Sequence, residues 1–206
     1  MIKTVVFDLG KVLVDFDYRI AARNLAARSR LTAEQIIEFV SRDPALLRYE
    51  RGLLTNEEFY QAIRAAAGFA GDFTEFAGLF GNIFSAIDPM VQLHAALRER
   101  GLPTYIFSNT NDFAVRHIRG HFPFFSRFDG YILSYEHRAL KPEPELYQVV
   151  ERQTGQRGSA VLYLDDRPEN VEAGAARGWQ VLLHQTPEKT RAAVQALGLL
   201  PACPLT

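Results

Sequence analysis

Polar side chains directly follow three of the short apolar runs in this chain of 206 residues. Asp8 follows the first run, Ser108 and Asn109 follow the second, and Asp165 and Asp166 follow the fourth. In open parallel sheets, ligands bind beyond the carboxyl ends of the strands, so these positions are suited to chemistry. Taken singly, each side chain also fits an ordinary role as a turn or helix cap or as solvated loop charge. Their combination favours a shared site.

Carboxylates dominate this set. Asp8, Asp165 and Asp166, gathered on one edge of a buried sheet, would repel one another and raise one another's pKa unless a cation balanced them. Magnesium suits such a place because it binds a few carboxylate oxygens together with water and substrate phosphate. Lys141, directly before Pro142, could offset the charge further and hold an anionic intermediate, although most lysines are simply exposed. The residues therefore predict a Mg²⁺ site beside an anionic substrate.

The elements that would position these residues alternate between apolar runs and helical patterns. The runs lack strict polar alternation, as strands buried on both faces do. Helical patterns open at Asp88, Pro168 and Thr186, and they stop at glycines. This alternation predicts a doubly wound α/β fold with a parallel sheet. The expected strands are residues 4–7, 103–107, 131–133, 161–164 and 180–183.

Residues from about 15 to 87 break this rhythm with helix-like segments and no convincing strand. Seven of the phenylalanines in this part of the chain form a set typical of the core of a small helical bundle. We therefore expect residues 1–14 and 89–206 to form the α/β core and residues 15–88 to form a helical insertion. The expected helices are 18–28, 32–40, 56–67 and 73–83; the phenylalanines are Phe39, Phe59, Phe69, Phe73, Phe76, Phe80 and Phe84.

Charge and cysteine content exclude several classes of partner and site. Lys plus Arg number 23 against 24 Asp plus Glu, a net charge of −1, so no basic field favours nucleic acid or an anionic membrane. Cys203 is the single cysteine and cannot form an intrachain disulfide, which fits a reducing compartment. The first apolar stretch ends at Asp8, too early for a signal peptide or a membrane span. We expect a cytoplasmic protein with a small-molecule or protein partner.

Four segments together resemble the haloacid dehalogenase superfamily in order and spacing. They are residues 5–13 around Asp8, residues 106–109, Lys141 with Pro142, and residues 164–166 with Asn170. The resemblance implies a Rossmann-like core, and the helical insertion looks like the cap that one subfamily carries after its first strand. Members similar to α-D-glucose-1-phosphate phosphatases and to the amino-terminal phosphatase half of soluble epoxide hydrolases share these features.

The resemblance also implies catalytic roles. Asp8 would attack phosphorus and form an aspartyl phosphate. Ser108, with the neighbouring Asn109, would bind the phosphoryl oxygens, and Lys141 would bridge the phosphoryl group and the Asp8 carboxylate.

A metal site is implied by the same resemblance. Asp166, with Asp165 close behind it, would hold Mg²⁺ together with an oxygen of Asp8 and the backbone carbonyl of Gly10.

Gly10 departs from the pattern of the superfamily, whose phosphatases usually carry a second aspartate at this position as a general acid. Loss of a positioned acid typically costs ~10² to 10⁴ in rate. Asp15 and Asp17 are the nearest replacements, or they form a solvated hinge. Glycine also occurs here in the subgroup resembling α-D-glucose-1-phosphate phosphatase, so Gly10 does not by itself exclude turnover.

The helical insertion contains a loop that could reach the substrate. Gly52 marks a break, and Thr55 or Asn56 caps the helix that follows. Arg51 could contact a sugar hydroxyl or a second anionic group, or it is an exposed arginine at a helix end.

These observations predict a Mg²⁺-dependent phosphomonoesterase for a small phosphorylated metabolite, with a sugar 1-phosphate as the first candidate. One alternative is a 2-haloacid dehalogenase, which needs no metal and gains nothing from Asp165 and Asp166 beside a carboxylate substrate. Another is a binding module that has lost turnover, for which Gly10 is the support. Against such a module, a cluster of charges at the strand ends costs folding energy, and a protein without turnover has no use for it. The oligomeric state is left open.

Overall fold

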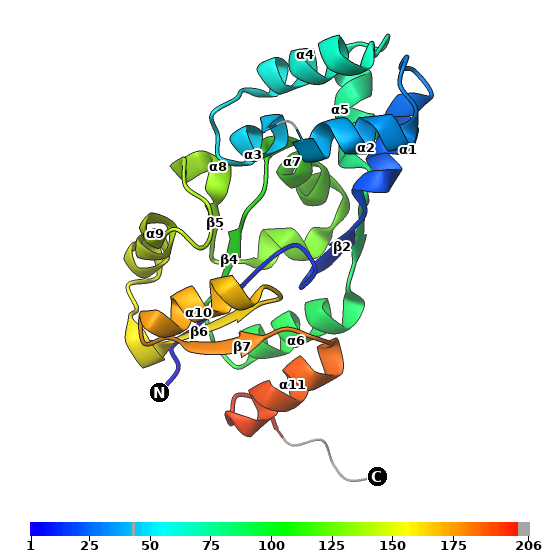
Figure 1. Cartoon of the computed structure of the whole chain (residues 1–206). Helices are drawn as coiled ribbons and strands as arrows, with labels where there is room; N and C mark the ends of the chain where they lie inside the picture. Colours follow the sequence, from blue (N-terminus) through cyan, green and yellow to red (C-terminus); the bar gives the residue numbers. More distant parts are fainter. Residues whose placement is uncertain (43, 202–206) are drawn as a thin grey trace.

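The computed structural model describes residues 1–42 and 44–201, with no account of the side chain of residue 41 (Figure 1). Cys203 lies outside the described residues. A sheet of five parallel strands forms the centre of the molecule, in the order β5-β4-β1-β6-β7. This confirms the expected α/β fold. The strands are β1 (Thr4–Phe7), β4 (Thr104–Ser108), β5 (Gly130–Leu133), β6 (Val161–Asp165) and β7 (Gln180–Leu183).

The central strand β1 lies between β4 and β6 because the chain first builds one side of the sheet and then crosses to the other. All four residues of β1 and all five of β6 are buried, as their apolar sequences require. In the register, Phe7 pairs with Ile106 on one side and with Leu164 on the other. The residues that follow these strands therefore emerge side by side at one sheet edge, where the strand order reverses.

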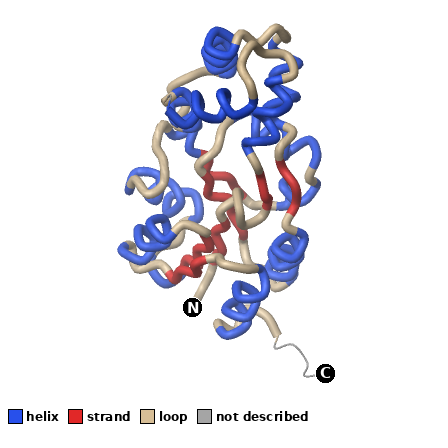
Figure 2. Tube along the Cα trace, turned by 45° about the vertical axis from the view of Figure 1, so that its right-hand side comes forward, coloured by secondary structure: helices blue, strands red, loops and turns tan. Residues whose placement is uncertain are grey.

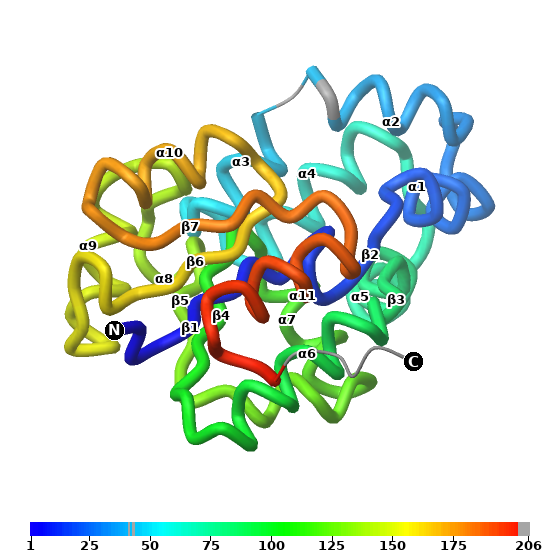
Figure 3. Tube along the Cα trace, turned by 90° about the horizontal axis from the view of Figure 1, so that it is seen from below, coloured from blue at the N-terminus to red at the C-terminus, as the bar shows by residue number. Residues whose placement is uncertain are grey.

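Helices cover both faces of the sheet, and each face has its own apolar core (Figure 3). On one face, Met90, Leu93 and Val194 pack beneath the strands. On the other, Leu146, Tyr147 and Val150 do so. The first face is covered by α6 (Asp88–Glu99), α7 (Asp112–His121) and α11 (Pro187–Ala196), and the second by α9 (Pro144–Thr154) and α10 (Pro168–Ala176).

Proline in the first turn begins several of these helices, where its missing N–H costs no hydrogen bond. The predicted starts at Asp88 and Pro168 are confirmed. None of the helices in the described ranges is long and apolar enough to cross a bilayer. Short helical turns complete the connections: η1 (Pro123–Arg127), α8 (Ser134–His137) and η2 (Gly158–Ala160).

The helical insertion lies beyond one end of the sheet and has a separate apolar core (Figure 1). Phe59, Phe69, Phe76 and Phe80 are buried there, which confirms the interpretation of the phenylalanines as packing residues. Phe113 of α7 joins this core and ties the insertion to the sheet layer. Its helices are α1 (Tyr18–Ala26), α2 (Ala33–Arg42), α3 (Ala45–Glu50), α4 (Asn56–Ala67) and α5 (Phe73–Gly81).

Two short strands correct the expectation that residues 15–87 contain no strand. The strand β2 (Val14–Phe16) pairs antiparallel with β3 (Phe84–Ala86) (Figure 2). In this register Asp15 lies opposite Ser85. Each is three residues long, too short for a recognisable pattern. Their pairing arises because the chain enters and leaves the insertion at the same place, where the two backbones satisfy each other's hydrogen bonds.

Candidate active site

The carboxyl ends of β1, β4 and β6 converge on one cavity of about 340 Å³. Asp8 follows β1, Ser108 ends β4, and Asp166 follows β6, and all three line this cavity. Asn109 and Lys141 line it too. The structure therefore brings together the polar residues whose position after strands marked them in the sequence.

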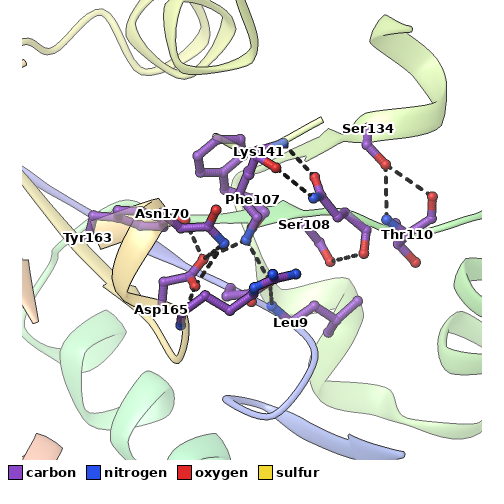
Figure 4. A network of polar contacts seen from close by, with 12 residues as sticks. Leu9, Phe107, Ser108, Thr110, Ser134, Lys141, Tyr163, Asp165 and Asn170 are labelled. Atoms are coloured by element: carbon purple, nitrogen blue, oxygen red, sulfur yellow. Dashed lines mark hydrogen bonds and ion pairs between the residues drawn. The ribbon is translucent and has the colours of Figure 1, made fainter. Parts of the chain in front are cut away.

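Lys141 is the electrostatic centre of the site. Its Nζ atom lies 2.9 Å from Oδ1 of Asp8 and 2.6 Å from Oδ2 of Asp165, and it donates a hydrogen bond of 2.9 Å to the carbonyl of Phe107. Figure 4 shows this side chain directed at Asp165. Burial opposes the charged form, but Asp8 and Asp165 outweigh it and raise the pKa of Lys141. Lys141 is therefore a buried, permanent cation, and the alternative that it is simply an exposed lysine does not hold.

Asn109 holds the backbone of Lys141 in place. Its Nδ2 atom donates to the Lys141 carbonyl at 3.1 Å, and its Oδ1 accepts from the Lys141 N–H at 2.7 Å. Ser108 is buried beside it, and its hydroxyl donates to the Asn109 carbonyl at 3.3 Å. The residues at the end of β4 thus fix the lysine and also face the cavity.

Three carboxylates lie close together in the site. One oxygen from each of Asp8, Asp165 and Asp166 can be chosen so that the three lie within 4.8 Å of one another. Burial, together with the charges of Asp165 and Asp166, raises the pKa of Asp8 to about 7 against the opposing effect of Lys141. Burial and Asp165 also raise the pKa of Asp166. This excess of oxygen donors and negative charge fits a hard divalent cation.

The three carboxylates are not equivalent. Asp165 is fully buried, and Oδ1 accepts from the Arg167 N–H at 2.9 Å and from Asn170 at 3.0 Å. Its Oδ2 accepts from Lys141 and from the Tyr163 hydroxyl. Burial opposes ionisation, but these donors hold the pKa of Asp165 below its ordinary value. Asp165 is therefore suited to orienting Lys141, whereas Asp166 is half-buried and lines the cavity.

Gly10 lies where the sequence resemblance places it, in the loop after β1 and on the cavity wall. Oδ1 of Asp8 accepts from the Leu9 N–H at 2.7 Å, which orients the carboxylate at the start of this loop. Lys11, the next residue, pairs with Asp15 at the base of the helical insertion.

Three residues considered from the sequence lie elsewhere. Arg51 does not line this cavity, because its guanidinium pairs with Glu143. Asp15 is held by Lys11, and Asp17 caps α1 and pairs with Arg19. The hydrogen bond from Lys11 lowers the pKa of Asp15, and that from Arg19 lowers the pKa of Asp17. Neither carboxylate lines the cavity, which favours the second alternative, a solvated hinge, over a replacement for the acid.

Other residues of the cavity wall carried no usable sequence signal. Tyr18 and Glu50 reach the cavity from α1 and α3 of the helical insertion. Thr110 and Asn111 extend the wall beyond β4, and Asn111 also caps α7. Glu50 directly precedes Arg51 in a segment that the sequence did single out. The helix that ends there turns the glutamate, and not the arginine, toward the cavity.

Comparisons with known proteins agree with this architecture. A family model described as haloacid dehalogenase-like hydrolase matches residues 2–178. A D-ribitol-5-phosphate phosphatase from Bacteroides thetaiotaomicron is 24% identical over 87% of this chain and 90% of that protein. A sesquiterpene phosphatase from Aspergillus oryzae is 25% identical over 89% of this chain and 90% of that protein.

A solved structure extends the comparison to the fold. An enzyme of the same family from Bacteroides thetaiotaomicron, in complex with magnesium and inorganic phosphate, superposes with a TM-score of 0.79 at 26% identity. The match covers 90% of this chain and 95% of that one.

Proposed function

The chain belongs to the haloacid dehalogenase-like hydrolase family and is a phosphatase, and we propose that it hydrolyses small phosphomonoesters through a covalent bond to Asp8. The observation that carries this proposal is the pairing of a buried, oriented Asp8 carboxylate with Lys141 at the cavity floor. The oriented Asp8 carboxylate can attack phosphorus, and the fixed Lys141 cation balances the negative charge of the carboxylate and of the phosphoryl group.

The reaction proceeds in two displacements at phosphorus. Oδ of Asp8 attacks the phosphoryl group, and the ester oxygen leaves with its electron pair; water then attacks the aspartyl phosphate and releases phosphate. Lys141 stabilises the negative charge of the transferring group, while Ser108 and the adjacent backbone bind its oxygens. Asn109 acts through Lys141, whose backbone it holds.

Magnesium is the cofactor, as in the structural relative with bound magnesium and phosphate. In our proposal, Asp8, Asp166 and the Gly10 carbonyl hold it, with Asp165 behind them fixing Lys141. When bound, Mg²⁺ neutralises phosphate charge and polarises the phosphoryl group. Assigning Asp165 this orienting role revises its place among the expected ligands.

The helical insertion serves as a cap in this proposal, with residues 1–14 and 89–206 as the catalytic core. Leu47 and Glu50 of α3 line the same cavity as Asp8 and Ser108. A cap in this position limits the access of bulk water to the acyl phosphate and selects the organic part of the ester.

The substrate class we propose is a small phosphorylated metabolite such as a sugar or polyol phosphate, with a sugar 1-phosphate as the first candidate. The cavity volume of about 340 Å³ suits a ligand of this size. Its wall carries Tyr18, Glu50, Asn109 and Asn111, which can donate to and accept from hydroxyl groups. A D-ribitol-5-phosphate phosphatase among the relatives is consistent with a polyol ester.

A substrate panel tests this proposal. Phosphate release is measured with sugar 1-phosphates, polyol phosphates, a prenyl phosphate and nucleotides, each with Mg²⁺ and with EDTA. We expect Mg²⁺-dependent release from at least one sugar or polyol phosphate, at a higher kcat/KM than from nucleotides. Absence of phosphate release throughout, with halide release from 2-chloropropionate, would overturn the proposal in favour of dehalogenation.

A further inference from the structure

Hydrolysis of a sugar or alkyl phosphate needs a proton donor, because an alkoxide is a poor leaving group in neutral water. The loop after β1 supplies none at position 10, where the residue is glycine. The donor must therefore lie elsewhere on the cavity wall. Arg167 aside, the titratable groups that line the cavity within the described chain are Asp8, Lys11, Tyr18, Glu50, Lys141 and Asp166.

Most of these groups cannot release a proton to the substrate. Asp8 and Asp166 are committed to phosphorus and magnesium in the proposed reaction. Lys141 is held between two carboxylates, and Lys11, on the cavity wall, is paired with Asp15. Burial raises the pKa of Tyr18 far above neutrality. Glu50 remains, a group that binds neither the metal nor the phosphoryl group.

The surroundings of Glu50 hold its carboxyl group in place and raise its pKa. Burial raises the pKa of Glu50 to about 7, against the opposing effects of the Tyr18 hydroxyl and the more distant Arg167 guanidinium. The Tyr18 hydroxyl donates to Oε1 of Glu50 at 3.3 Å. A carboxyl group with this pKa exists at neutral pH partly as an acid and partly as a base.

The sheet layer fixes the backbone of Glu50. From α8, which packs against α3, the Ser134 hydroxyl donates to the Glu50 carbonyl at 2.6 Å. The nearby charge of Glu143, at the start of α9, is engaged by Arg51. Tyr18 and Arg167 are thus the charged or titratable groups that act on the Glu50 carboxyl. Its attachment to the sheet layer places this residue of the cap in a defined position over the site.

We propose that Glu50 is the general acid that protonates the leaving oxygen, supplied by the helical insertion instead of the loop after β1. This proposal rests on the proposed phosphatase function. As the Asp8–phosphorus bond forms and the ester P–O bond breaks, the Glu50 proton moves to the departing oxygen. In the second step, the Glu50 carboxylate takes a proton from the attacking water while the phosphorus–Asp8 bond breaks. Glu50 is then protonated again, and the cycle closes.

Glu50→Gln separates proton donation from binding because an amide keeps the size and hydrogen-bonding capacity of the acid. The quantity to measure is kcat/KM, which reports the step in which the leaving group departs, for an alkyl phosphate and for p-nitrophenyl phosphate. We expect ~10²- to 10⁴-fold loss with the alkyl ester, whose leaving oxygen needs a proton. With the nitrophenyl ester, whose leaving oxygen needs none, we expect less than about a threefold loss. Glu57→Gln, an exposed glutamate on α4, is the matched control.

The pH profile supplies a second readout. The alkyl phosphatase activity of the wild type should fall above about pH 7, as Glu50 loses its proton, and Glu50→Gln should lack this limb. Tyr18→Phe removes a hydrogen bond that lowers the Glu50 pKa, so the limb should move to higher pH.

Three results would overturn the proposal. The first is unchanged activity of Glu50→Gln on the alkyl phosphate. The second is an equal loss of activity on both esters in a Glu50→Gln protein of unchanged thermal stability. The third is an alkaline limb that persists in the pH profile of Glu50→Gln. If the wild type released no phosphate from either ester, the proposed function itself would fail, which is a distinguishable outcome.

Discussion

The ring of Phe16 occupies the space that a side chain at position 10 would need. A Cβ added to Gly10 would lie 2.8 Å from Cε1 of Phe16, closer than such atoms approach in proteins. Phe16 itself is held in β2, where its ring contacts Tyr18 and Phe84 and lies under Lys11. The packing of the loop after β1 against the helical insertion therefore leaves no room for an aspartate at position 10.

Gly10→Ala should destabilise the protein, because the extra methyl group forces the Phe16 ring out of its packing. Overpacking of this kind typically costs about 1–3 kcal/mol in the free energy of unfolding. Gly10→Ala combined with Phe16→Leu should recover part of this loss, because leucine frees the space of the ring. Urea unfolding of the single and double variants measures the coupling between the two positions. Strictly additive effects would show that the two side chains do not compete.

Lys141→Met should abolish phosphatase activity and destabilise the fold in the absence of magnesium. Asp8 and Asp165 would then be buried without their cation, and removal of one partner from a buried pair typically costs about 3–5 kcal/mol. Urea unfolding in EDTA and phosphate release in Mg²⁺ provide the two measurements. Lys189→Met, at an exposed lysine of α11, is the control and should change neither quantity. A Lys141→Met protein with wild-type turnover would contradict the site.

Magnesium should stabilise the wild-type protein without any substrate, because it relieves the repulsion among Asp8, Asp165 and Asp166. A ligand at 100 times its Kd adds about 2.7 kcal/mol to the free energy of unfolding. Thermal melts with Mg²⁺ and with EDTA measure the effect. Asp166→Asn should lose most of it, whereas Asp88→Asn, at an exposed position in α6, should keep it. An equal rise of Tm in Asp166→Asn would place the ion elsewhere.

His94 should make the fold sensitive to mild acid. It is buried, stacked on Phe128 at 3.8 Å and hydrogen-bonded to Thr104 at 3.0 Å. Burial, aided by Arg98, lowers its pKa from 6.5 to about 4. Between pH 4 and pH 6.5, the unfolded chain therefore binds more protons at this histidine than the folded chain does. The neutral, buried His94 thus contributes to stability above pH 6.5, and this contribution is lost as the pH falls toward 4.

The size of this contribution is at most about 3.5 kcal/mol, since each pKa unit corresponds to about 1.4 kcal/mol. Unfolding free energies measured from pH 7 down to pH 4 should fall less steeply in His94→Gln than in the wild type. His121→Gln, at an exposed position of α7, should follow the wild-type curve. Parallel curves for all three proteins would remove His94 as the acid-sensitive group.

The sequence predicts the sheet and its reactive edge because both depend on local patterns. Buried apolar runs predict β1, β4 and β6, and the residue after each run lies at the carboxyl end of its strand. By contrast, the pairing of β2 with β3 joins residues about seventy positions apart and has no local signature. Tertiary contacts of this kind also decide that Arg51 pairs with Glu143 while its neighbour Glu50 lines the cavity. Strand-end chemistry is thus readable from the sequence, whereas side-chain direction within the insertion is not.

Trapping of the covalent intermediate tests the role of Asp8 most directly. The protein is mixed with Mg²⁺ and a substrate that it turns over, quenched in acid within the first turnover, digested and analysed by mass spectrometry. The account predicts one added phosphoryl group on the peptide that contains Asp8, and neither this adduct nor steady-state phosphate release in Asp8→Asn. Phosphoryl transfer to another residue, or full phosphate release by a folded Asp8→Asn protein, would contradict it.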